Sequence, residues 1–501
     1  MVEMVTLTVV VLYCVLLIAI GSWASKKIHN SEDYILAGRS LGFWVFTILI
    51  VASICSGMTL LGVSGLGYAA GWPTIWEQIF VPLSAAFAII VFGVKLNHVG
   101  TQEGYMTIQD YFAHRFESPR AMRGLSAVAG IIVSLIYLIG QYTAISIILV
   151  WLFGIQHWQA LLIAGIVITL YTTIGGLYAV SWTTLFQGGI LILGVLIMAP
   201  LVILQAGGLT SINGALAEIN PNFVQPYMPA GAPAFTPEFL VSFGLLLMIG
   251  LACAPHVINN VLAAKDEKYF RWSPVIAFAV YAVVMFLVKF TGFAGRSLVE
   301  SGALVLPEAI NAQDFILVYS IQLVSSSVFV WAIFAVIVLA AVMSTTDRLM
   351  LTVGTMFGWD VYRNILRPSA SDKEVLMVSK VSVVAAAGGT LLLAVNPPPM
   401  LAWLIWMGIG VMLATFAVPL LAGLYWRGAT RQGAIASMSI GLVSAGIFGY
   451  WHQYVAALPV HFSFYALVLS FVAMVAVSLL TAKNDSGILD STCTGWFIQP
   501  K

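Results

Sequence analysis

Long apolar runs separated by short polar segments make up most of the chain, and most runs are about 20 residues long. A helix of about 20 apolar residues spans the hydrocarbon core of a bilayer, whereas a membrane barrel would show alternating segments of about ten residues. The pattern therefore predicts an all-α polytopic membrane protein of about 13 transmembrane helices. The expected spans lie near residues 4–23, 41–70, 73–95, 122–152, 157–178, 181–206, 237–262, 273–298, 314–356, 374–395, 398–426, 432–451 and 461–481. The run 314–356 is too long for one crossing, and we expect an amphipathic external helix before a span that starts near residue 327.

Basic residues give an independent prediction of how the chain is oriented. With the N-terminus outside, 17 of the 21 Lys and Arg residues fall in the segments that would face the cytoplasm. Cytoplasmic loops of membrane proteins carry such an excess, and one span more or fewer would destroy the partition. The sequence thus predicts a multi-pass protein of the cell membrane, with the N-terminus outside and the C-terminus cytoplasmic.

Composition narrows the functional classes. The chain is 61% hydrophobic and 8% charged, with a net charge of +1, which argues against a nucleic-acid partner. The four cysteines are scattered, and no GxxxxGK[ST], HExxH or GxSxG motif occurs. We therefore expect neither an enzyme nor an ATP-driven pump, no cofactor, and no obligate protein partner. Residues 1–501 are interpreted as a single transmembrane domain.

Three predicted spans contain polar or broken segments, which are costly in a membrane and tend to mark a transport path. They read "ASICSGM" (52–58), "LACAPHVINN" (251–260) and "AAVMSTTDR" (340–348). Pro255, in the second of them, removes a backbone donor and frees the carbonyl one turn earlier, although a plain kink would have the same sequence.

The first two breaks are five spans apart, so two five-helix units would each begin with an interrupted helix. The units would cover about 41–206 and about 237–426, with 4–23, 432–451 and 461–481 as extra spans. This is the pattern of inverted-repeat transporters, whose unwound segments build an ion and substrate site near the midplane.

The third segment supplies oxygen ligands. Ala341, Ser344 and Thr345 are spaced i, i+3 and i+4, so one carbonyl and two hydroxyls share a helix face. Carbonyls of an unwound second span, Ala52 and Cys55, would complete five neutral oxygens around one point, which suits a hard cation such as sodium. The alternative is that these hydroxyls only bond back to their own helix or to a neighbouring helix.

Four ordered motifs make the chain resemble the sodium:solute symporter family over nearly its whole length. They are "DYILAGRSLG" (33–42), "YTTIGGLYAVSWTTLFQ" (171–187), "AAVMSTTDRLML" (340–351) and "GLYWRGATRQGA" (423–434). The resemblance implies thirteen spans with a LeuT-like 5+5 inverted repeat. It also implies a sodium site made by Ala52, Cys55, Ala341, Ser344 and Thr345.

The chain departs from the family pattern in several places. Ile54 and Thr184 stand where many members carry Asp, so the resemblance implies at most one sodium ion per cycle. Gly428 occupies the slot of a usual basic residue, with Arg427 beside it. Asp347 follows the sodium-site hydroxyls, where it would pair with Arg348 or face an inner vestibule.

Three segments look closest to pantothenate permeases of that family: 205–226, "APHVINNVLAAKDEK" (254–268) and "NPPPMLAWLIWMGIG" (396–410). Proline carriers tend to place aromatic residues where this chain has Leu247 and Leu251. The expected function is therefore import of a small organic solute by symport with sodium, with a carboxylate such as pantothenate as solute. The alternatives are a proton-coupled or uncoupled carrier of the same fold, a sodium symporter for proline, another amino acid or a monocarboxylate, and a transport-like sensor.

No fixed cation for a substrate carboxylate is evident in the sequence, because Lys289 is expected to snorkel to the outer surface. An anionic solute would instead meet the positive end of a half-helix after Gly57. Packing or helix capping would explain the individual side chains equally well. The candidate substrate-binding residues are Ser53, Ser56, Gly57, Gln78, Gln141, Tyr142, Pro255, His256, Asn259 and Trp406.

Overall fold

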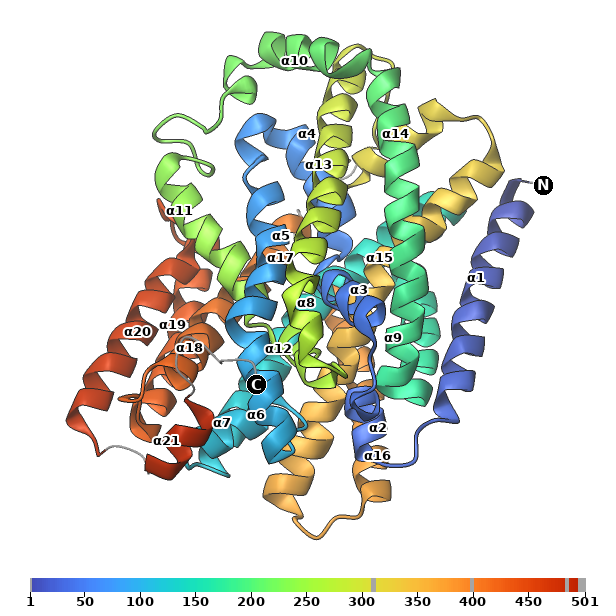
Figure 1. Ribbon diagram of the computed structural model, residues 1–501. Coiled ribbons are helices and arrows are strands. Elements are labelled where there is room, and N and C mark those ends of the chain that lie inside the picture. The colour runs from blue at the N-terminus through green and yellow to red at the C-terminus, as the bar shows by residue number, and fades with distance from the viewer. Residues whose placement is uncertain (1, 308–311, 397–400, 483–485, 494–501) are drawn as a thin grey trace.

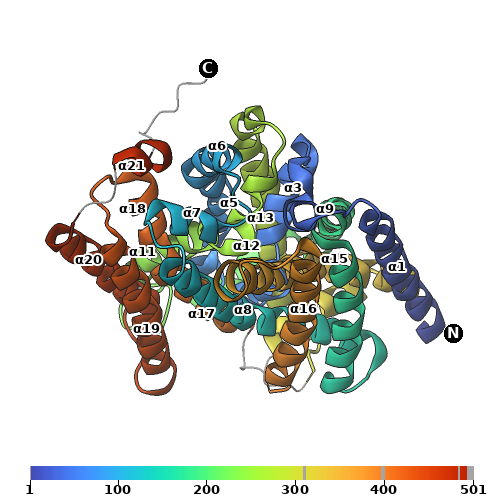
Figure 2. The same ribbon diagram turned by 90° about the horizontal axis from the view of Figure 1, so that it is seen from below.

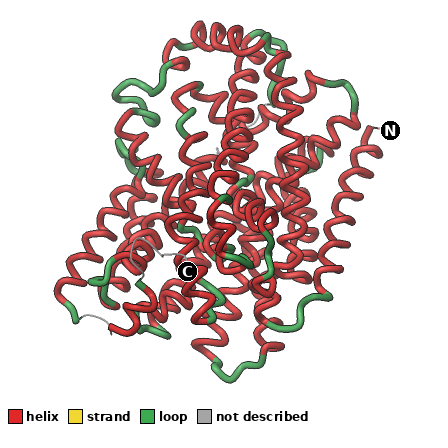
Figure 3. Tube along the Cα trace, viewed as in Figure 1, coloured by secondary structure: helices red, strands yellow, loops and turns green. Residues whose placement is uncertain are grey.

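The computed structural model describes residues 2–307, 312–396, 401–482 and 486–493, and these residues form a bundle of helices (Figure 1, Figure 3). Within these ranges, ten helices are long and apolar enough to cross a membrane, or twelve if two bent pairs each count as one span. The predicted all-helical membrane fold is confirmed. The first residues of the predicted span 398–426, residues 398–400, lie outside the described residues.

The bounds of the main helices are as follows: α1 Val2–Ser25, α2 Ser31–Leu36, α3 Phe43–Ile54, α4 Val63–Ala70, α5 Glu77–Phe87, α6 Val94–Glu103, α7 Ile108–Arg115, α8 Ala121–Phe153, α9 His157–Gln205, α10 Gly208–Ile219, α11 Pro237–Leu245, α12 Pro255–Ile258, α13 Ser273–Glu300, α14 Ile316–Val324, α15 Val328–Thr355, α16 Asp372–Ala394, α17 Leu401–Met412, α18 Val418–Tyr425, α19 Arg431–Tyr454, α20 Phe462–Leu480 and α21 Ser486–Thr492. Figure 1 shows α10 at one end of the bundle and α2 and α7 at the other. We call these ends the outer and the inner face, after the orientation that the basic residues predict.

Helix α9 has 49 residues and reverses direction within its length. The Nε2 atom of its first residue, His157, lies 2.9 Å from the carbonyl oxygen of Ala394, at the end of α16. Its second arm packs Gly194 against Ile337, early in α15. Helices α15 and α16 are antiparallel neighbours, so the start of α15 and the end of α16 lie at the same face of the bundle. Both arms of α9 therefore reach this one face. The turn falls at Gly176, where φ is +49°. Counting the two arms as two crossings would agree with the predicted thirteen, a number that stays a prediction.

Two spans are broken where the sequence predicts. Helix α3 ends at Ile54, and the next helical segment, Met58–Ala70, is bent by 61° from it. The segments Pro237–Gly250 and Pro255–Ala263 meet at 42°. The run 314–356 divides into the short α14 and the long α15, also as expected. Both breaks lie inside the bundle, away from its peripheral helices. Figure 2 shows α1 on one side of the molecule and α19 and α20 on the other.

At the inner face, the turn Ala37–Arg39 after α2, the start of α7 with the connection before it, and the segment that follows α12 are joined by hydrogen bonds. The guanidinium of Arg39 donates to the carbonyl oxygens of Tyr105, at 2.6 Å, and Leu262, at 3.3 Å. The side-chain oxygen of Asn259 accepts from the backbone N–H of Ile108 at 2.9 Å. These bonds fix the second broken span to the inner ends of its neighbours.

The reversal of α9 gives a first testable prediction. A side chain at Gly176 would be strained at its positive φ, and a Cβ would lie 2.8 Å from the backbone oxygen of Tyr34. We expect Gly176→Ala to lower the free energy of unfolding by about 2 kcal/mol or more. Thermal unfolding in detergent measures this, with Gly189→Ala as the control because nothing lies within 4 Å of a Cβ there. Equal melting temperatures for the two variants would contradict a tight turn at Gly176.

Candidate sodium and solute site

The break after α3 leaves two carbonyl groups without their usual helical partners. In a continuous helix the N–H of Ser56 would bond the carbonyl of Ala52, and the N–H of Thr59 that of Cys55. Instead, the Ser56 N–H donates to the Thr59 hydroxyl at 3.1 Å, and the Thr59 N–H donates to the Ser56 carbonyl at 2.9 Å. The carbonyls of Ala52 and Cys55 are therefore available to another ligand.

The hydroxyls of α15 lie at these two carbonyls. The Thr345 Oγ1 is 2.9 Å from the carbonyl oxygen of Ala52 and 2.8 Å from that of Cys55. The Ser344 Oγ is 3.4 Å from the oxygen of Ala52 and 2.9 Å from that of Ala341. The structure thus brings together the five oxygens that the sequence predicts as a sodium site.

The proton count of this cluster favours a cation. Five oxygens converge, but only the two hydroxyls carry a proton, so the three carbonyl oxygens compete for two donors. A small cation bound by neutral oxygens would satisfy all of them at once. Among the residues that the structure describes, no group of three or more His, Cys, Asp or Glu side chains could hold a metal ion, so a transition metal has no comparable site.

A cavity adjoins the broken helix on its other side. Two predicted residues, Ser56 and Trp406, line it, together with Ile54, Met58, Thr59, Val63, Glu77, Val81, Tyr137, Leu247, Leu251, Tyr281, Met285 and Ile409. Its free volume is about 10 Å³, room for about one water molecule, so the site would have to expand to admit a solute. Polar groups meet there: the Tyr137 hydroxyl donates to the Ser56 hydroxyl at 3.2 Å, and Thr59 and Tyr281 hydroxyls lie 2.8 Å apart.

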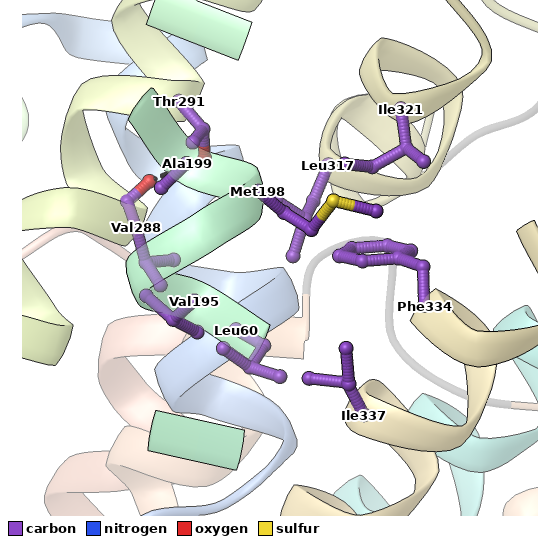
Figure 4. A pocket seen from close by; sticks show the side chains of 10 residues that line it. All are labelled: Leu60, Val195, Met198, Ala199, Val288, Thr291, Leu317, Ile321, Phe334 and Ile337. Carbon is purple, nitrogen blue, oxygen red and sulfur yellow. Dashed lines mark hydrogen bonds between the residues drawn. The ribbon is translucent and has the colours of Figure 1, made fainter. Parts of the chain in front are cut away.

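A second cavity of the same size, shown in Figure 4, offers almost nothing polar. Thr291 is its only hydroxyl, and that hydroxyl donates to the carbonyl of Val288 in its own helix at 2.7 Å. The lining otherwise consists of apolar side chains from α9, α13, α14 and α15 and of Leu60 (Figure 4). The cavity with the polar groups is therefore the better candidate for a polar solute.

One lining residue of the polar cavity, Glu77, belongs to a buried ion pair. The Lys289 Nζ is 3.2 Å from the Glu77 Oε2, and the two side chains are 0% and 1% exposed. The expectation that Lys289 reaches the outer surface is therefore wrong, as is the expectation that no fixed cation is available near the site. Among the described residues, the second oxygen of Glu77 and the indole N–H of Trp406 have no hydrogen bond of good geometry, although the indole lies close enough to this carboxylate to interact with it. The pair therefore adds one positive and one negative group, each able to bind part of a solute.

Two more predicted residues fix the unwound segment rather than line the cavity. The Gln141 side-chain oxygen accepts from the Gly57 N–H at 3.0 Å, and its amide nitrogen is buried without a partner among the described residues. A Cβ at Gly57 would lie 2.4 Å from the Cβ of Ala144, so only glycine fits there. The contact joins α8 to the point where the broken helix resumes.

The remaining predicted residues lie outside the cavity lining. The Ser53 hydroxyl donates to the Leu49 carbonyl at 2.6 Å, and the Tyr142 hydroxyl points to the sulfur of Met350. Gln78 is buried, and neither of its amide atoms has a hydrogen-bond partner within the described part of the chain. Pro255 begins α12, and Asn259 belongs to the inner closure described above. His256 is buried behind Tyr137, with ring centroids 5.6 Å apart. Their role in substrate binding stays a prediction.

Asp347 does not pair with Arg348. Its carboxylate accepts from the hydroxyls of Tyr171 and Thr172, both on the first arm of α9. The two adjacent residues of α15 therefore point in different directions, as a rotation of about 100° per residue requires. Asp347 therefore fixes the first arm of α9 to α15.

The fold and the site define a membrane carrier with paired broken helices and an oxygen cage at one break. The model of the sodium:solute symporter family matches residues 34–441, and the chain belongs to this family. Its members are transporters rather than enzymes.

Individual relatives are similar over most of their length. The sodium/pantothenate symporter of Haemophilus influenzae is 28% identical over 82% of this chain and 83% of its own. The sodium/proline symporter of Salmonella typhimurium is 28% identical over 89% and 87%. A solved Na+-coupled sialic acid symporter superimposes with a TM-score of 0.77 at 17% identity, covering 96% of this chain and 98% of that one. The fold is thus LeuT-like, as predicted.

Proposed function

We propose that this chain imports a small carboxylate, such as pantothenate, by symport with one sodium ion. The observation that carries the proposal is the Thr345 hydroxyl placed between the two carbonyls freed by the break in the first repeat. The fit of five neutral oxygens supports sodium as the coupling ion, and the similarity to sodium/pantothenate symporters supports the solute. No other cofactor is proposed.

The proposed cycle uses the two broken spans as moving parts. Sodium binds between α3 and α15, replaces the hydrogen bonds of Ser344 and Thr345, and holds the segment 52–58 in the geometry that receives a solute. The units 41–206 and 237–426, which we take as inverted repeats, then close around the solute and open the inner face. The proposal has the N-terminus outside and the C-terminus in the cytoplasm, which the distribution of basic residues supports.

The ion pair gives the proposed solute two contacts. Its carboxylate would bind Lys289, and a hydroxyl or amide hydrogen would bind Glu77 or a neighbouring hydroxyl. A zwitterion such as proline would use both charges, and this favours proline as the second candidate, which the sodium/proline relatives also support. Leu247 and Leu251 in the cavity lining leave more room than aromatic side chains there would.

Uptake into proteoliposomes tests the proposal. An imposed sodium gradient at fixed pH, with a membrane potential of 100 mV, is expected to accumulate labelled pantothenate. The potential alone, at about 2.3 kcal/mol per charge, would support roughly fifty-fold accumulation, and the sodium gradient adds to it. The matched arm applies a pH gradient without sodium. Accumulation in that arm alone would show proton coupling, and accumulation of proline but not pantothenate would select the second candidate.

A further inference from the structure

Arg348 is a buried cation for which the structure shows no counter-ion. The residue is 2% exposed, its Nε is buried without a hydrogen-bond partner, and it forms no ion pair with any of the described residues. Buried charges are costly and are normally paired. Its neighbour Asp347 is bonded to α9 instead.

The helix places Arg348 on the face that the solute path uses. It follows Ser344 by four residues and Thr345 by three, so it lies on the same face of α15, about one turn closer to the inner face. Helix α15 packs against α12, and Arg348 lies near enough to His256 in α12 for their charges to interact. Arg348 therefore faces the second broken span, just inside the sodium site.

The surroundings of His256 contain further polar groups without a partner. Among the described residues, neither ring nitrogen of His256 has a hydrogen bond of good geometry, although the ring lies close to the backbone of Ser53. The side-chain oxygen of Asn260 is also buried without a partner there, and its amide nitrogen donates to the Ser53 hydroxyl at 2.9 Å. A carboxylate here would accept two parallel hydrogen bonds from the guanidinium and one from the imidazole. Asn260 could accept from a hydroxyl or amide of the same solute.

This cluster lies between the cavity and the inner closure. Tyr137 lines the cavity and packs against His256, so it separates the two. On the inner side, the bonds of Asn259 and Arg39 hold the segment 255–264 in place. When those bonds break, a solute that passes Tyr137 would meet His256 and Arg348 next.

We infer that Arg348, with His256, forms a second carboxylate-binding site on the inner side, which receives the solute before its release. This rests on the proposed function in one respect only, that the solute carries a carboxylate. It goes beyond that function because it assigns a separate binding site to residues outside the polar cavity. This site would be used when the inner face is open. Sodium coupling is not needed for it.

Exchange measured from each face tests the inference without a sodium gradient. Everted and right-side-out membrane vesicles expose the inner and the outer face to the medium, and exchange is run with any carboxylate that the wild-type protein carries, at a saturating concentration inside the vesicle and a varied concentration in the medium. Arg348→Gln is expected to raise the KM from the inner face at least tenfold and to leave the KM from the outer face within twofold. Arg348→Lys, which keeps the charge but not the paired donors, should give a rise of roughly threefold.

Several results would overturn the inference. An unchanged KM from the inner face would do so, and if the half-saturation by sodium changed at the same time, Arg348 would act on the cation instead. An equal rise in the KM from both faces would also overturn it. A wild-type protein that exchanges only neutral solutes would overturn it as well. Absence of sodium-driven accumulation together with a raised inner KM would contradict the proposed coupling but support this site. A cooperative thermal unfolding transition at the wild-type temperature, measured for each variant in detergent, shows that it is folded.

Discussion

The double variant Ser344→Ala/Thr345→Ala is expected to lose sodium-driven uptake. It removes two of five oxygens around the proposed ion but leaves the backbone of α15 and the carbonyls of Ala52 and Cys55 in place. A hydrogen bond or ligand contact to a charged group contributes about 1.5–3 kcal/mol, so two contacts amount to roughly 3 kcal/mol or more. Sodium affinity should fall about 100-fold or further.

A matched control on the same helix separates this effect from a general loss of packing. The Thr346 hydroxyl donates only to the carbonyl of Val342, one turn earlier in α15, at 2.7 Å. Thr346→Ala removes a buried threonine hydroxyl from the same turn without touching the site, so uptake should keep its sodium dependence. The measurement is the half-saturation of uptake by sodium, with thermal stabilisation by sodium as a second readout. Full sodium-dependent uptake in the double variant would refute the site.

The sequence predicted the sodium cluster because its chemistry is local. Ser344 and Thr345 share a helix face by spacing alone, and a polar, glycine-containing stretch inside an apolar span marks where backbone carbonyls become free. The breaks in both repeats and the division of 314–356 follow from the same kind of local signal. The structure adds the reason that Ala52 and Cys55 are the free carbonyls, since Ser56 and Thr59 bond each other.

The ion pair could not be predicted in the same way. Glu77 and Lys289 are far apart in the chain and meet only because α5 packs against α13. Lys289 is close to the end of its predicted span, where a lysine normally reaches water. The bent half-helix α4 covers it instead, and Gly67 allows this because a Cβ would lie 2.9 Å from the Lys289 carbonyl oxygen. Similarly, the sequence shows that Tyr142 and Asn259 are polar residues within predicted spans. It does not show where each side chain points, because that depends on how its helix is rotated about its axis.

Loss of either partner of the buried ion pair is expected to cost more stability than loss of both. Lys289→Met leaves the Glu77 carboxylate buried without its cation, which should lower the free energy of unfolding by about 3–5 kcal/mol. The double variant Glu77→Gln/Lys289→Met has no buried charge and should regain most of that loss. Thermal unfolding of the two variants and of Glu77→Gln measures the coupling between the residues.

Transport by the stable double variant then shows what the pair does. If the pair binds the solute, the double variant should be folded, stabilised by sodium, and unable to transport, because both charged contacts are missing. The control is Arg296→Gln/Glu300→Gln on the same helix, an ion pair of 3.9 Å whose side chains are 26% and 58% exposed, so that the pair should contribute less than about 1 kcal/mol and its loss should leave uptake intact. Normal uptake by the Glu77→Gln/Lys289→Met protein would instead assign the pair to structure, and the carboxylate would have to be recognised elsewhere in the cavity.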